Sequence, residues 1–225
     1  MSDKVYPGDE FFDQALRLCI NDNDTAEEEN TLFLKAINKG LALDDEWLAY
    51  NFLGSGYLEV SDDQRALSAY RKAFALIDKV SKEKLSDQKD LLKASKQKCG
   101  ILFCIKGVEQ EEASEYFDAQ ATYEEAVKLT DHPIAHEKLV RLYEIFSGVK
   151  NKTENLKKAV YHNDYIINNE TQLEHFPKYQ EVLAYAKEKK SSLSKELGAA
   201  TTGHKVKIIV GVIIAFMILR LIGCH

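Results

Sequence analysis

Apolar residues recur at the spacing of an α-helix along nearly the whole chain, whose 225 residues include only three prolines. This periodicity predicts helices and no sheet. Pro133 and Pro177 suit the first turn of a helix, where no backbone hydrogen bond is lost. We therefore predict an all-α fold with helices over residues 9–20, 24–39, 44–59, 62–80, 86–106, 109–130, 133–146, 152–168 and 177–197.

The breaks between these predicted helices contain capping residues. Asp24 and Asp44 can accept hydrogen bonds from free amides at the start of a helix, and Gly40 can adopt the left-handed conformation that often ends one. Gly107 is predicted to end the long fifth helix. The acidic run 109–112 would then lie in a first turn, where negative charge complements the helix dipole.

Two consecutive predicted helices share a spaced motif of small and aromatic residues. Its seven positions are Tyr50, Leu53, Gly54, Tyr57, Ala66, Tyr70 and Ala73. Small residues let the two helices approach closely, and aromatic side chains fill the space beside them. The pattern resembles the tetratricopeptide repeat (TPR), a helix pair of about 34 residues.

Weaker copies of this pattern lie on both sides. The second copy keeps Phe103, Gly107, Ala119, Tyr123 and Ala126, whereas Lys106 and Gln110 replace the usual Leu and Tyr. A third copy has Tyr143, Phe146, Ser147 and Ala159, and the first helix pair, with Phe12, Ala15, Phe33 and Ala36, fits after a one-residue shift. The resemblance implies an α-solenoid, an array of antiparallel helix pairs that stack on one another.

TPR families are mainly protein-binding scaffolds whose inner groove is lined by the first helix of each pair. The resemblance places Leu48, Asn51, Ser55, Ile101, Cys104 and Val108 in that groove. Chaperone-binding members hold a carboxylate with Lys, Arg and Asn, and Asn51 alone suggests such a clamp here. The apolar positions favour a peptide with hydrophobic side chains. The alternative is that helices of the chain itself fill the groove.

The most apolar segment lies at the end of the chain. Residues 208–219 contain no polar side chain, and Lys205, Lys207 and Arg220 flank them. A helix that is apolar all round is buried or spans a membrane. Residues 206–223 would extend about 27 Å, close to the roughly 30 Å of hydrocarbon in a bilayer. We predict a cytosolic domain over 1–197, a flexible linker over 198–205 and a transmembrane anchor over 206–223.

Chemistry-bearing residues form no recognisable site. His132 and His136 are four residues apart, but no further ligand follows at a fixed spacing, so we interpret them as solvated residues at a helix start. Cys19, Cys99 and Cys104 lack metal-ligand or disulfide spacing and are predicted to be small core residues. A phosphate-binding loop and a serine nucleophile motif are also missing. We expect no enzyme activity, no cofactor and no metal.

Helical repeats followed by a short, basic-flanked tail resemble the fission adaptor of the mitochondrial outer membrane and, more loosely, the plant-type import receptor. This implies a tail-anchored adaptor or receptor that binds a partner protein or targeting peptide on the cytosolic side, in organelle fission or protein import. Alternatives are a membrane-anchored co-chaperone of the endoplasmic reticulum or peroxisome, and an enzyme with an unrecognised site. The net charge of −6 offers no basic surface for nucleic acid. Homo-oligomerisation and modification of Cys224 are left open.

Overall fold

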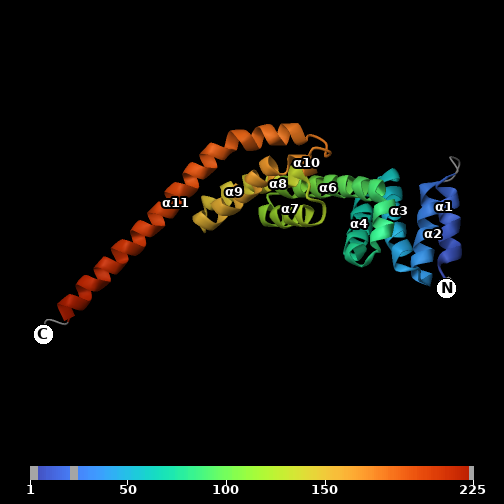
Figure 1. Ribbon diagram of the computed structural model, residues 1–225, viewed down its shortest axis with the longest axis horizontal. Helices are drawn as coiled ribbons and strands as arrows, with labels where there is room; N and C mark the ends of the chain where they lie inside the picture. Colours follow the sequence, from blue (N-terminus) through green and yellow to red (C-terminus); the bar gives the residue numbers. More distant parts are fainter. Residues whose placement is uncertain (1–4, 21–24, 223–225) are drawn as a thin grey trace. The chain divides into compact units, whose positions relative to one another are not determined.

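The computed structural model describes residues 5–20 and 25–222, with side chains through Thr202. Over these residues the regular elements are helices, and no strand occurs (Figure 1). The prediction of an all-α fold is therefore confirmed. The chain divides after His132 into two compact units.

The first unit consists of helix pairs joined in series. α1 (Asp9–Leu18) pairs with α2 (Ala26–Lys39), α3 (Leu43–Glu59) with α4 (Asp63–Leu76), and α6 (Lys89–Glu112) with α7 (Tyr116–Thr130). A 3-10 turn, η1 (Ile77–Lys79), and α5 (Lys82–Asp87) connect the second pair to the third. Because α3 also packs against α2 and α6, the pairs stack within this unit.

In the second and third pairs, a tyrosine of the second helix packs against a glycine of the first helix. A Cβ at Gly54 would lie 2.6 Å from Cε1 of Tyr70, and one at Gly107 would overlap the ring of Tyr123. Both tyrosine rings have no exposed surface. The two helices can approach only because glycine lacks a side chain, and this is the packing that the repeat motif predicts.

The other predicted packing positions are buried or half-buried. Leu53, Tyr57, Ala66, Ala73, Ala119 and Ala126 are buried. Tyr50 is half-buried, and the Lys72 ammonium lies 5.4 Å from the centroid of its ring. In the weaker copies Phe12, Ala15, Phe33, Ala36, Tyr143, Ser147 and Ala159 are buried, and Phe146 is half-buried.

Gly107 does not end its helix, so that prediction was wrong. α6 continues to Glu112. A glycine inside a helix costs only about 1 kcal/mol relative to alanine, and this one makes room for Tyr123. Glu109 and Glu111 consequently lie in the last turn of a helix rather than the first, where the helix dipole does not favour them.

The predicted caps are confirmed in part. Gly40 follows α2 with a positive φ of 98°, but its ψ of 127° differs from the left-handed helical conformation that was predicted. Thr25 caps the start of α2 by accepting from the backbone N–H of Glu28, and Asp24 lies outside the described residues. Asp44 is not a cap, because α3 begins at Leu43 and the Asp44 carboxylate instead accepts hydrogen bonds from Ser81.

The second unit has its own core. α8 (Pro133–Ser147) and α9 (Lys152–Asn168) form a pair, followed by α10 (Glu170–Leu173) and α11 (Tyr179–Ile222), which packs against α9 and α8. One buried cluster comprises Ile166, Leu173, Phe176, Tyr179, Val182, Leu183 and Ala186. The helix start at Pro133 agrees with the prediction.

α11 is a continuous helix to Ile222, so residues 198–205, predicted as a flexible linker, are helical. Leu197, Ala199 and Ala200 favour a helix strongly enough to include Gly198. Within the part of the chain whose side chains are described, no helix has the length and apolar character to cross a membrane. The predicted anchor over 206–223, with Lys205, Lys207 and Arg220, lies outside that part.

Candidate functional site

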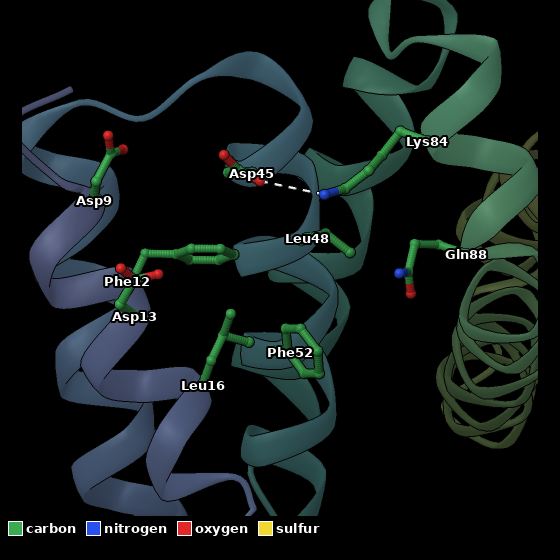
Figure 2. A pocket seen from close by; sticks show the side chains of 9 residues that line it. All are labelled: Asp9, Phe12, Asp13, Leu16, Asp45, Leu48, Phe52, Lys84 and Gln88. Atoms are coloured by element: carbon green, nitrogen blue, oxygen red, sulfur yellow. Dashed lines mark hydrogen bonds and ion pairs between the residues drawn. The ribbon is translucent and has the colours of Figure 1, made fainter. Parts of the chain in front are cut away.

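The first unit contains a groove bounded by α1, α3 and α5. Its cavity measures about 510 Å³. The lining residues are Asp9, Phe12, Asp13 and Leu16 of α1, Asp45, Leu48 and Phe52 of α3, Lys84 of α5, and Gln88, which follows α5 (Figure 2). The first helices of two consecutive pairs thus form two of its walls, and the α5 segment contributes to the third.

The floor of this groove is apolar and held by aromatic packing. The Phe12 and Phe33 rings meet edge to face at 5.9 Å between centroids, and Phe33 stacks on Phe52 at 5.3 Å. Phe12 and Leu48 are buried, whereas Leu16 and Phe52 are half-buried. The partly exposed side chains provide apolar surface that a ligand could cover.

The groove is acidic at its edge. Asp9, Asp13 and Asp45 contribute three carboxylates, against the single ammonium of Lys84 among the lining residues. Lys84 Nζ lies 3.4 Å from Asp45 Oδ1, and Figure 2 shows the lysine reaching from α5 toward α3. The Asp9 carboxylate also accepts a hydrogen bond from the backbone N–H of Tyr6 at 2.7 Å.

Of the groove residues predicted in the first copy, Leu48 alone lines the cavity. Asn51 has no exposed surface, and its amide donates to the Trp47 carbonyl at 2.8 Å. Ser55 is half-buried, with its hydroxyl 3.1 Å from the hydroxyl of Tyr70 and accepting from Lys98 Nζ at 3.1 Å. Asn51 therefore contributes to packing and does not form part of a carboxylate clamp.

The predicted groove positions of the second copy differ among themselves. Ile101 is exposed and Val108 is half-buried. Cys104 is buried, with its Sγ 3.7 Å from Nδ1 of His132. The imidazole of His132 also packs against Gly100, where a Cβ would overlap it. A residue of the chain itself therefore covers Cys104, which corrects the expectation that this position faces a ligand.

Most of the groove was not predictable from the repeat motif. Phe12 belongs to the shifted outer copy, Leu16 holds no motif position, and Lys84 lies in a segment outside the repeat period. A signal was nevertheless present, because Asp9, Phe12, Asp13 and Leu16 lie three and four residues apart, on one face of a helix.

A second cavity, of about 530 Å³, lies between α4 and α6. Its lining includes Asp63 and Glu109 as well as Arg71 and Lys106, so its formal charges balance. Arg71 is also paired with Glu125, and its guanidinium lies 5.0 Å from the centroid of Phe103. This cavity therefore lacks the charge selectivity of the groove.

The histidines predicted to be solvated at a helix start are fully buried. His132 fills the space beside Gly100, and His136 Nδ1 lies 3.0 Å from Nδ1 of His162 in the second unit. Burial, followed by the charges of His136 and Lys158, lowers the pKa of His162 to about 3. The imidazole of His162 is therefore uncharged near neutral pH, and the two histidines form part of the core.

Metal-binding and thiol chemistry find little support in the described residues. No group of three or more His, Cys, Asp or Glu side chains is placed there to hold a metal ion. Cys99 and Cys104 are buried, as predicted, but Cys19 is exposed and its thiol donates to Glu29 at 3.3 Å. Although the residue as a whole is exposed, partial desolvation of the thiol and the neighbouring carboxylate of Glu29 raise the pKa of Cys19 to about 12, which disfavours the reactive thiolate.

No protein-family model matches the chain, and no curated protein matches it either. Among solved structures, it is similar to nearly identical TPR-like repeats of a Podospora anserina protein assigned to the kinesin light chains. The match covers 89% of this chain and 99% of that chain, with 15% sequence identity and a TM-score of 0.34. At this score the similarity adds nothing to the argument from helix packing.

Proposed function

We propose that the chain is a membrane-tethered adaptor that binds a segment of a partner protein in the groove between α1, α3 and α5. The observation that carries this proposal is the partly exposed apolar floor, where Leu16 and Phe52 line a cavity formed by the first helices of stacked pairs. Cavities of this size hold side chains through apolar contacts, while a few polar groups fix their orientation.

For this groove we propose binding rather than catalysis, because its partly exposed apolar floor offers surface for a ligand to cover. The three carboxylates at its edge would also repel the terminal carboxylate that chaperones present. The co-chaperone alternative is for this reason weaker than a general adaptor.

The tether in this proposal rests on the tail sequence. Residues 208–219 are apolar without interruption, and Lys207 and Arg220 delimit a short span. Mitochondrial and peroxisomal tail anchors tend to combine a short span with basic flanks, so we favour the mitochondrial outer membrane. The groove would then be on the cytosolic side, where an adaptor could serve organelle fission or protein import.

Substitution of Leu16 by aspartate tests the groove. Covering a leucine side chain is worth about 1.5–3 kcal/mol, so Leu16→Asp should reduce capture of the partner about tenfold or more. Ile105→Asp is a matched control, because Ile105 lines the cavity between α4 and α6 and is 43% exposed. The measurement is quantitative pull-down with the full chain, after circular dichroism has shown that both variants are folded.

The control also defines the result that would contradict the proposal. Partner capture that survives Leu16→Asp but is lost with Ile105→Asp would assign binding to the cavity between α4 and α6. Equal capture by both variants and by the unchanged chain would exclude both cavities as the site of binding.

The location of the tail is tested separately, by fluorescence of residues 198–225 fused to a reporter. We expect the fusion to mark mitochondria. Arg220→Ser should shift it toward the endoplasmic reticulum, because it removes the distal charge that limits the span. An endoplasmic reticulum pattern for the unchanged tail would overturn the mitochondrial assignment, and an unchanged pattern for Arg220→Ser would show that the distal charge is not the targeting signal.

A further inference from the structure

The connection between the second and third helix pairs is longer than the repeat period requires. Tyr50 and Phe103 hold the same position in the motif and lie 53 residues apart, whereas one repeat has about 34. The additional residues form η1, α5 and the beginning of α6. We define Ser81–Gln88 as the α5 strap, since it comprises α5 and the residue on each side of it.

The α5 strap is attached to the beginning of α3 by two neighbouring aspartates. Ser81 donates from its backbone N–H to Asp44 at 3.0 Å and from its hydroxyl at 2.6 Å. Lys84 forms the second attachment, through its ion pair with Asp45. The first attachment lies outside the cavity lining, whereas both partners of the second line the groove (Figure 2).

The Lys84–Asp45 pair is long and partly accessible to water. The side chains of Lys84 and Asp45 are 28% and 33% exposed, and their closest N–O distance is 3.4 Å. Ion pairs so accessible to water contribute little to folding. The Asp44–Ser81 hydrogen bonds attach the α5 strap to α3 without involving Lys84.

We infer that the groove recognises an amphipathic segment with a lysine or arginine beside its apolar side chains, and that Lys84 competes with that cation for Asp45. This inference rests on the proposed adaptor function. The ligand's apolar side chains cover Leu16 and Phe52, its cation replaces the ammonium of Lys84, and Asp9 and Asp13 add attraction. An acidic segment would meet three carboxylates and be repelled.

The test uses the full chain in phosphatidylcholine nanodiscs and three synthetic helical peptides. The peptides share a leucine face and carry lysine, glutamine or glutamate on the opposite face. Fluorescence anisotropy measures their affinity, with empty nanodiscs as the blank. We expect the lysine peptide to bind most tightly and the glutamate peptide least, and the lysine peptide to lose affinity as salt rises.

Removing the charge of Lys84 or of Asp45 tests whether Lys84 competes with the ligand's cation. Lys84→Met should tighten binding of the lysine peptide about two- to five-fold, and Asp45→Asn should weaken it by a similar factor, the range expected for one partly exposed charge pair. In Asp45→Asn, adding Lys84→Met should change little, because the contested carboxylate is gone. Lys82→Met is the control, since Lys82 is exposed on α5 and does not line the groove.

The outcomes separate this inference from the proposed function. Equal affinity for the lysine and glutamine peptides, or equal effects of Lys84→Met and Lys82→Met, would overturn the inference. If partner capture still depends on Leu16 in that case, the adaptor function stands. If capture does not depend on Leu16, the proposed function fails, whatever the peptides show.

Discussion

Replacing Tyr70 by alanine is expected to lower the free energy of unfolding of the first unit by about 3–5 kcal/mol, the usual cost of removing a large aromatic side chain from a core. Tyr70 has no exposed surface, its ring lies against Gly54, and its hydroxyl is 3.1 Å from Oγ of Ser55. The measurement is urea unfolding followed by the fluorescence of Trp47, which is the single tryptophan of the chain and is buried in the same unit.

A double-variant cycle shows whether Gly54 and Tyr70 act as one packing unit. Gly54→Ala alone should cost about 1–3 kcal/mol through overpacking, since its Cβ would lie 2.6 Å from the Tyr70 ring. In the Tyr70→Ala background the same methyl group enters space that the ring has left. The combined loss should therefore be smaller than the sum of the two, and strict additivity would contradict the proposed contact.

Gly198→Ala serves as the matched control for the glycine substitution. Gly198 is exposed within α11, and a Cβ there would meet no other atom within 4 Å. The same change should therefore be neutral or stabilise the helix by up to about 1 kcal/mol. Thermal unfolding followed by circular dichroism measures this effect. A marked loss of stability would show that replacing a helical glycine by alanine destabilises the chain even where no overpacking occurs.

Local spacing was sufficient to predict the contacts inside a helix pair. The distances in sequence between Gly54 and Tyr70, and between Gly107 and Tyr123, are the same, and both glycines accept the ring of their tyrosine. The helix boundary at Gly107 failed because glycine was interpreted as a terminator, although the motif itself places Gly54 inside a helix. Packing demand outweighed intrinsic propensity at that position.

Contacts with segments outside the repeat motif could not be predicted in the same way. Covering Cys104 requires His132, 28 residues away, and a glycine at position 100 to admit the ring. The Lys84–Asp45 pair joins residues on an inserted strap and on α3, outside any repeat spacing. One copy of the motif predicts how two helices meet but does not predict which side chains of other segments enter its groove.

The second unit is expected to lose stability in acid because of His162. A histidine in the unfolded chain has a pKa near 6.5. In the folded chain the pKa of His162 is lowered to about 3, mainly by burial and to a smaller extent by the charges of His136 and Lys158. Between these values the unfolded state binds more protons. The contribution of His162 to the free energy of unfolding is therefore complete above about pH 6.5. It decreases by about 1.4 kcal/mol per pH unit as the pH falls, until the folded pKa is reached.

His162→Gln removes the titrating group, so the pH dependence of this variant should be flatter than that of the unchanged chain. Between pH 7 and pH 4.5 the difference in their free energies of unfolding should change by about 2–3 kcal/mol. Hydrogen exchange of the α9 amides, compared at equal pH, assigns this effect to the second unit, because His162 lies within α9. His175→Gln, in the same unit at a half-buried position, is the control.

The expected loss of stability in acid is linked to the contact between His136 and His162. His162 Nδ1 lies 3.0 Å from that of His136, and its ring stacks on Tyr143 with the centroids 5.8 Å apart. Protonating both histidines would place two positive charges side by side in a region with little water, where repulsion adds to the cost of burial. A variant curve parallel to that of the unchanged chain would show that His162 keeps its ordinary pKa, and that acid sensitivity arises from the carboxylates instead.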